Sequence, residues 1–274
     1  MNERGSSRWR SSTLVLAFIF LYTPIAWVIL YSFSATTAGF DWRRWSLRWY
    51  QALLTDETFR SAAFTSMLLA ILSATVATFL GTLAGVALAR IPRFRGRSLM
   101  LLLLAIPIFA PEILIGFAFL MLFVGLQAVI GWPEGKGLTT LVIAHATLGM
   151  SLVASIVFAR VAGRDPTLEQ AASDLGARPL RIFATVTIPL AMPGIVAGWL
   201  LALTISFDDV ITSSFLAGPD NATLPMAVYS SIRVGVNPEL NAIGTLLVAG
   251  VGLMLAVAVA TWRKRGPRID ATAA

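Results

Sequence analysis

Six long apolar stretches constrain this chain more than any other feature of its sequence. A hydrocarbon core about 30 Å thick is crossed by roughly 20 helical residues, and every stretch reaches that length. None alternates apolar and polar residues as a membrane β-strand does, which predicts an all-α integral membrane protein with six transmembrane helices. The predicted spans are Leu14–Phe33, Ala62–Ala89, Leu99–Val124, Leu138–Ala159, Met192–Leu216 and Ala242–Trp262.

The composition agrees with a lipid environment. Apolar residues make up 57% of the 274 residues and charged residues 13%, too little polar surface for a water-soluble domain. The first span follows a basic segment, but it exceeds the about 7 to 15 apolar residues of a signal peptide and reads as a retained anchor. We expect a cytoplasmic N-terminus at 1–13, one transmembrane domain at 14–262 and a cytoplasmic tail at 263–274.

The distribution of basic residues predicts the topology. With the N-terminus in the cytoplasm, 15 of the 21 Lys and Arg residues fall on the inner side, so the positive-inside rule places both termini there. The basic residues behind the net charge of +7 are thus distributed according to the membrane topology, and nucleic acid is not expected as a partner. Because the chain has no cysteine, it can form no disulfide, and no thiolate can act as a nucleophile or bind a metal. We predict no catalytic residue and no metal site.

The predicted cytoplasmic loop from Arg160 to Pro189 is much longer than two neighbouring membrane helices need. Asp165 and Pro166 suit the start of a helix, and Thr167 and Gln170 have the spacing of a capping box. Gly176 is expected to end this helix in the left-handed conformation. A helix of about two turns is marginal alone, so it needs something to pack against. Either a separate protein or the helix bundle above it could supply that surface.

A second helical segment is expected to open at Arg178-Pro179, and Pro189 marks the start of the fifth span. From Glu169 to Ala177, with a distal Ile-Pro, the loop resembles the EAA signature of ABC importer permease subunits; Gln170 departs from the usual Ala. The residues expected to couple to an ATPase are Glu169, Ala171, Ala172, Asp174, Gly176 and Pro189.

This resemblance implies the type I importer permease fold, with cytoplasmic coupling helices that insert into a separate ATPase subunit. It further implies a homologous second permease, two ATPase subunits and an extracytoplasmic binding protein around a chain in the bacterial inner membrane. ATP and magnesium would belong to the ATPase subunits, so no cofactor is expected in this chain. The only Gly-Lys pair, Gly135-Lys136, is followed by Gly137 and does not form a phosphate-binding loop.

A narrower resemblance, to the permeases for spermidine and putrescine, extends over nearly the whole chain. It is carried by Ser206-Phe207-Asp208-Asp209-Val210, Leu224-Pro225 and the stretch from Val234 to Ala242, and is nearest to the second permease of putrescine importers. The resemblance implies uptake of putrescine- or spermidine-type polyamines. Permeases for other cationic or opine-like solutes share much of this pattern, so those substrates stay open.

Three carboxylates lie within apolar spans, Glu112 in the third and Asp208 with Asp209 in the fifth. An ionised group at a helix centre costs about 2.5–3.5 kcal/mol on insertion scales, so it usually faces a cavity, a partner or a substrate path. Adjacent helical positions point about 100° apart, so Asp208 and Asp209 cannot both face one narrow path. In the resembling family the positions of these three acids and of Trp49 are implicated in uptake.

Two other classes of protein are compatible with membrane carboxylates. An intramembrane aspartyl protease needs two acids that converge from different helices, so Glu112 would have to join one of the aspartates. A passive channel gives no reason for the long cytoplasmic loop. His145, the single histidine, cannot make a metal site alone and is interpreted as a hydrogen-bonding residue between helices.

Overall fold

The computed structural model describes residues 3–36, 44–234 and 238–265, in which the regular elements are helices and one isolated β-bridge joins Ser34 to Trp45. This confirms the predicted all-α class; the tail beyond Arg265 lies outside the described residues. The elements are α1 (Glu3–Ser32), α2 (Arg48–Thr55), α3 (Glu57–Arg90), α4 (Arg97–Phe109), α5 (Glu112–Ile130), α6 (Leu138–Ala162), α7 (Thr167–Asp174), α8 (Pro179–Ile182), the π-helical segment η1 (Phe183–Thr187), α9 (Ile188–Asp208), α10 (Ile211–Leu216), α11 (Leu224–Val234) and α12 (Glu239–Arg265).

Within the described residues, five helical stretches are long and apolar enough to cross a membrane. Two shorter apolar helices, Arg97–Phe109 and Glu239–Leu253, accompany them. The total of six transmembrane helices therefore stays a prediction. The five stretches are Thr13–Ser32, Glu57–Arg90, Glu112–Ile130, Leu138–Ala162 and Pro179–Asp208.

The third predicted span, Leu99–Val124, is not one helix. It is divided into α4 and α5 at Ala110 and Pro111. A proline has no N–H and disfavours helical geometry in the residue before it, and Ala110 accordingly has φ −76° and ψ 143°. Apolar periodicity alone does not register this break, which places Glu112 in the first turn of α5.

The fifth predicted span, Met192–Leu216, is wrong at both ends. A continuous helical stretch starts at Pro179, well before Pro189, and stops at Asp208. Its π-helical segment contains a bond from the N–H of Ile188 to the carbonyl of Phe183. The wider turn makes room for the ring of Pro189, which would otherwise meet the carbonyl four residues earlier. At the other end, Asp209 and Val210 separate α9 from α10.

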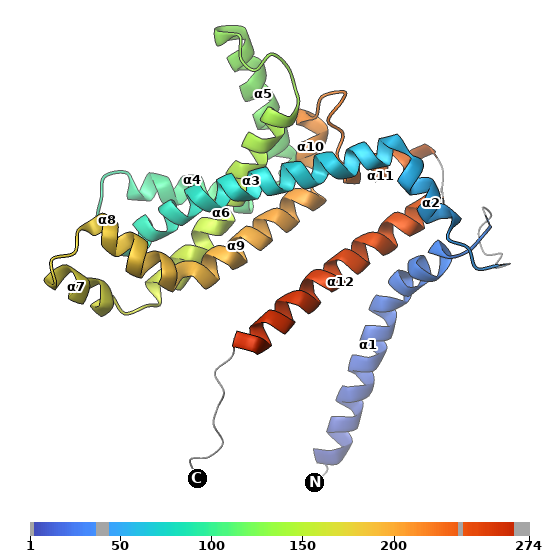
Figure 1. Ribbon diagram of the computed structural model, residues 1–274, viewed down its shortest axis with the longest axis horizontal. Helices are drawn as coiled ribbons and strands as arrows, with labels where there is room; N and C mark the ends of the chain where they lie inside the picture. Colours follow the sequence, from blue (N-terminus) through green and yellow to red (C-terminus); the bar gives the residue numbers. More distant parts are fainter. Residues whose placement is uncertain (1–2, 37–43, 235–237, 266–274) are drawn as a thin grey trace. The chain divides into compact units, whose positions relative to one another are not determined.

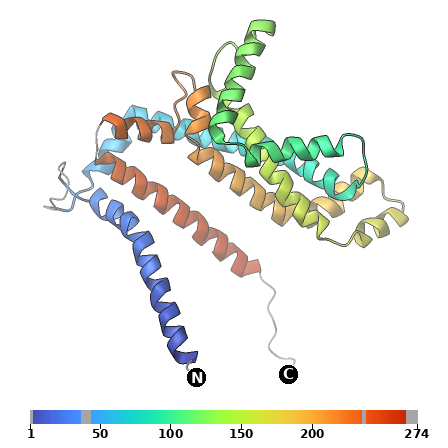
Figure 2. The same cartoon turned by 180° about the vertical axis from the view of Figure 1, so that it is seen from behind.

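The chain forms two compact units. The first comprises Met1–Arg60 with Ser230–Ala274, and in it α12 packs against α1 and α2. The second comprises Ser61–Tyr229 and holds α6 at its centre, with α9 and α4 packed against it. Within this second unit, Figures 1 and 2 show α3, α6 and α9 side by side, with α7 and α8 at one end of that bundle.

Glycines allow α3 and α6 to approach closely. A Cβ added to Gly85 would lie 2.6 Å from the carbonyl oxygen of Ala154, and one added to Gly81 would lie 2.8 Å from that of Met150. These two glycines of α3 are four residues apart, which is the small-xxx-small spacing of membrane helix contacts. Gly198 of α9 packs on Val153 of α6, which Gly81 of α3 also meets. Small residues thus determine how α6 is enclosed.

Candidate functional site

The two adjacent aspartates at the end of α9 have different surroundings. Asp208 is the last residue of α9 and its side chain is exposed. Asp209 is half-buried, and its carboxylate accepts hydrogen bonds from the N–H groups of Thr212 (3.1 Å) and Ser213 (3.0 Å) at the start of α10. Asp209 thus satisfies backbone donors that the helix start leaves free. Of the two acids, Asp208 is the exposed one.

Asp209 is also paired with the single histidine. Nε2 of His145 lies 3.1 Å from Oδ2 of Asp209, and the imidazole is almost completely buried. On the other side of the ring, Nδ1 lies 2.8 Å from Oγ of Ser206 in α9. The predicted packing role of His145 is therefore correct, but its partners could not be read from the sequence. Within the described residues, no group of three His, Asp or Glu side chains could hold a metal ion.

Glu112 follows the break between α4 and α5, and its side chain is exposed. One turn later in α5, Gly116 contacts α10: a Cβ added there would lie 2.7 Å from the ring of Phe215 and 3.2 Å from Cα of Thr212. Farther along α5, Phe123 belongs to the same apolar cluster as Leu216 of α10. The two helices thus run in the same sense. Glu112 and Asp208 both precede the start of their contact.

Trp49 lies in the first unit and is only 6% exposed. Its indole N–H donates to the carbonyl of Ser34 at 2.7 Å, and the guanidinium of Arg48 lies 4.2 Å from the ring centroid. Both the polar edge and a face of this side chain are thus occupied by the chain itself. In this conformation Trp49 is a packing residue of α2.

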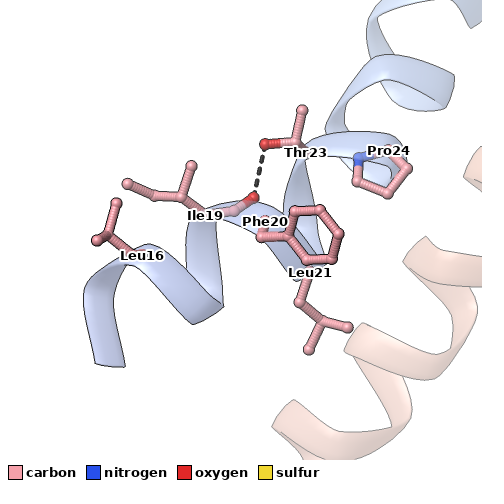
Figure 3. Close-up of a pocket in the computed structure, with 6 residues that line it drawn as sticks. All are labelled: Leu16, Ile19, Phe20, Leu21, Thr23 and Pro24. Atoms are coloured by element: carbon pink, nitrogen blue, oxygen red, sulfur yellow. Dashed lines mark hydrogen bonds between the residues drawn. The ribbon is translucent and has the colours of Figure 1, made fainter. Parts of the chain in front are cut away.

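A hollow on the side of α1 is lined mainly by apolar residues, and neither Glu112 nor Asp208 is among them. Figure 3 shows the six residues that line it, all from one helical stretch and almost all apolar. The hydroxyl of Thr23 donates to the carbonyl of Ile19 at 2.6 Å and is therefore occupied within the helix. None of its six lining residues is charged, so this lining does not suit a cation. Its lining residues are Leu16, Ile19, Phe20, Leu21, Thr23 and Pro24.

In the loop between α6 and α9, Glu169 points towards the helix bundle. Its Oε2 lies 2.7 Å from Nε of Arg90 at the end of α3, and its Oε1 accepts a hydrogen bond of 2.7 Å from the hydroxyl of Thr187. The two charged side chains are only 20% and 15% exposed. Glu169 thus connects α7 to two membrane helices of its own chain.

The opposite face of α7 is open. Ala171 and Asp174 are exposed and Ala172 is half-buried, and the apolar side chains of Leu168 and Leu175 are exposed as well, that of Leu175 to 89%. Positions 168, 171 and 175 follow the spacing of one helix face. We call Leu168, Ala171 and Leu175 the outer face of α7. Pro189, also an expected coupling residue, is exposed at the start of α9.

Gly176 ends α7 as predicted, with φ +79°. The N–H of Gly176 donates to the carbonyl of Ser173, and that of Ala177 to the carbonyl of Ala172. This pair of bonds is the Schellman motif, which favours glycine at the left-handed position. The capping box predicted between Thr167 and Gln170 is wrong, because α7 begins at Thr167 and the N–H of that residue donates to Asp165.

Residues 77–264 match the family described as binding-protein-dependent transport system inner membrane component. The chain belongs to this family. It is therefore a multi-pass inner membrane permease subunit of an ABC importer, not an enzyme, and the aspartyl protease and the passive channel are excluded.

Two curated relatives place the permease more narrowly. It is 44% identical over 248 residues to the putrescine transport system permease protein PotI of Escherichia coli K12, covering 90% of this chain and 88% of that protein. It is 36% identical over 249 residues to the spermidine/putrescine transport system permease protein PotC of the same strain, covering 91% of each. The predicted resemblance is confirmed.

A solved structure supports the fold of the permease. A chain of a bacterial alginate ABC transporter, in complex with an alginate pentasaccharide-bound periplasmic protein, matches with a TM-score of 0.69. The sequence identity is 16%, and the match covers 92% of the permease and 91% of that chain. At this identity the match shows the type I importer permease fold alone.

Proposed function

We propose that this permease moves putrescine- or spermidine-type polyamines into the cell. The similarity to PotI and PotC, whose names give these substrates, carries the proposal. The exposed carboxylates of Glu112 and Asp208 support it, because polyamines are cations and ionised acids in a membrane span require a compensating charge or a polar path.

The two helix breaks strengthen the assignment of the path. Transporters commonly bind ions and charged substrates at discontinuous membrane helices, where carbonyl groups released from the helix line a cavity. Glu112 follows the break between α4 and α5, and Asp208 precedes the break between α9 and α10. Each break thus combines a carboxylate with carbonyl groups that lack helical partners. A protonated amine can be recognised by both kinds of acceptor.

The assembly in our proposal has four kinds of component. A binding protein delivers the polyamine from outside, and this permease and a homologous second one form the path. Two ATPase subunits, which bind magnesium and ATP, supply the energy by hydrolysing ATP. The outer face of α7 and Gly176 form the surface that meets an ATPase subunit, while Glu169 anchors α7 from behind. Exposed leucines on a water-facing loop favour such a partner.

The decisive measurement is the KM for putrescine uptake in cells that express the complete importer. We expect Asp208→Asn to raise KM about tenfold, the equivalent of roughly 1.4 kcal/mol of lost substrate binding. Asp220→Asn is the matched control, because Asp220 is an exposed aspartate outside the spans, and its KM should be that of the unmodified protein.

An unchanged KM for Asp208→Asn would overturn the path assignment. Uptake of an opine in place of putrescine, by an importer with normal abundance, would assign the alternative substrate class. Both results are read against the amount of permease in the membrane, so a loss of folding is not mistaken for a loss of binding.

A further inference from the structure

A buried polar network connects three membrane helices to the break between α9 and α10. His145 of α6 is its centre, with Ser206 of α9 on Nδ1 and Asp209 on Nε2. The hydroxyl of Ser206 lies 2.9 Å from that of Ser73 in α3, and Oγ of Ser213 in α10 lies 3.2 Å from Nε2 of His145. So much polar contact in an apolar core calls for a role beyond packing.

The partners of the imidazole place a hydrogen on Nε2. Asp209 already accepts backbone N–H groups from Thr212 and Ser213, as an ionised carboxylate does. An ionised carboxylate can only accept, so Nε2 carries the hydrogen that His145 gives to Asp209. Nδ1, on the other side of the ring, lies 2.8 Å from the hydroxyl of Ser206. Each side of the ring thus has its own complementary partner.

The same three residue types form the nucleophilic triad of hydrolases, but this network cannot act as one. A triad serine must reach an acyl substrate and a set of oxyanion donors. Ser206 is only 6% exposed and His145 only 3%, and the serine hydroxyl also contacts Ser73. No substrate can approach the hydroxyl, so the network acts by holding the helices.

We propose that His145 is a positioning residue for substrate binding: through Asp209 it holds the helix break in the conformation that presents Asp208 to the polyamine. The inference rests on the proposed function of Asp208. Asp209 has extended backbone geometry, with φ −71° and ψ 122°, directly after the last residue of α9. Asp208 is the last helical residue of α9 and lies between Ser206 and Asp209, which both contact His145, so anchoring these two residues restrains the direction of the Asp208 side chain.

Two substitutions at one position separate the contacts of the imidazole. The amide of His145→Gln reaches the place of Nε2 and can still donate to Asp209, whereas that of His145→Asn ends near Nδ1 and reaches only Ser206. We expect His145→Asn to raise the KM for putrescine about tenfold with the maximal rate per permease retained, and His145→Gln to stay near the unmodified value.

Thr140→Val is the structural control on the same helix. It removes the 3.0 Å bond from Thr140 to the carbonyl of Leu216 at the far end of α10, away from Asp209. We expect reduced abundance without a change in KM. An equal rise in KM for Thr140→Val would show that any loss of α6–α10 contact has the same effect, and would overturn the special role of His145.

A double-mutant cycle with Asp208→Asn completes the test. If His145 acts through Asp208, His145→Asn should have no further effect on KM once Asp208 is asparagine. The same rise in both backgrounds would overturn the inference while leaving the proposed path intact. If Asp208→Asn itself leaves KM unchanged, the proposed function of Asp208 fails first, so the two failures are distinguishable.

Discussion

At the scale of single residues, four acidic side chains of this permease fall into two groups: two have a charged or imidazole partner in the chain, and two have no such partner among the described residues. Asp209 and Glu169 each have a basic or imidazole partner within 3.1 Å and further hydrogen bonds. Asp208 and Glu112 are exposed at helix ends. An ionised group in an apolar span is costly, so a partnered acid stabilises the fold and an exposed one points to function. Charge type alone could not separate the two groups.

The Arg90–Glu169 pair gives a prediction at this scale. Arg90→Glu places two carboxylates together and should destabilise the attachment of α7 by about 1–3 kcal/mol, since the pair is largely shielded from water. The measurement is putrescine uptake normalised to membrane abundance. Adding Glu169→Arg should restore most of it.

The exchange also distinguishes an internal anchor from a docking contact. If the carboxylate of Glu169 instead binds an ATPase subunit, the doubly substituted permease would transport no better than the single variants. Restoration therefore supports Glu169 as the inner support of α7, with Leu168, Ala171 and Leu175 left to meet the partner.

At the scale of helices, two kinds of residue determine the architecture of the second unit. Pro111 and Asp209 end regular helix inside apolar sequence, and each break brings a carboxylate to the end of a helix. Gly81 and Gly85 let α3 lie directly on the backbone of α6. Close backbone contact gives van der Waals packing, which drives helix association in lipid, where the hydrophobic effect is absent.

Substituting these glycines tests the packing. Gly85→Leu places a side chain where a Cβ alone would meet the Ala154 carbonyl oxygen at 2.6 Å, so we expect a loss of about 1–3 kcal/mol. The measurement is the thermal unfolding temperature of the purified importer in detergent. Gly125→Leu in α5 is the matched control, because nothing lies within 4 Å of its added Cβ. Equal unfolding temperatures for the two variants would contradict the proposed contact.

At the scale of the whole molecule, the permease must expose one surface to the outside and another to the ATPase. The positive-inside distribution predicts that α7 lies in the cytoplasm and that the turn between α10 and α11 lies outside. That topology is required if the outer face of α7 couples to ATP hydrolysis while the opposite side receives substrate from a binding protein.

The absence of cysteine from the sequence makes the topology directly measurable. We expect a membrane-impermeant maleimide to label Asp220→Cys in intact cells and to label Asp174→Cys only after the membrane is permeabilised. Both side chains are exposed, so a difference in labelling reports the side of the membrane. Labelling of Asp174→Cys from outside would reverse the orientation and, with it, the coupling assignment.

The sequence by itself was enough for the all-α class, the family and the left-handed glycine at 176. Each depends on local composition, spacing or backbone preference, which are properties of neighbouring residues. Prolines at 107, 111, 189 and 193 indicate helix breaks, but the predicted third span still crosses Pro111 because hydropathy averages over the residues that interrupt a helix. The break at Asp209–Val210 was missed, although the sequence allows Asp209 to cap a helix that starts before Thr212 and Ser213.

Only the tertiary structure shows that Asp209 is the aspartate that contacts His145 and that Asp208 is the exposed one. Sequence spacing shows that adjacent side chains diverge, but it does not show which of them meets His145, 64 positions before Asp209 in the chain. The same holds for Glu169, whose direction depends on Arg90 at the end of another helix. Hydrogen bonds and ion pairs between distant residues exist only once the helices have packed, and they determine which charge is structural and which is left for the substrate.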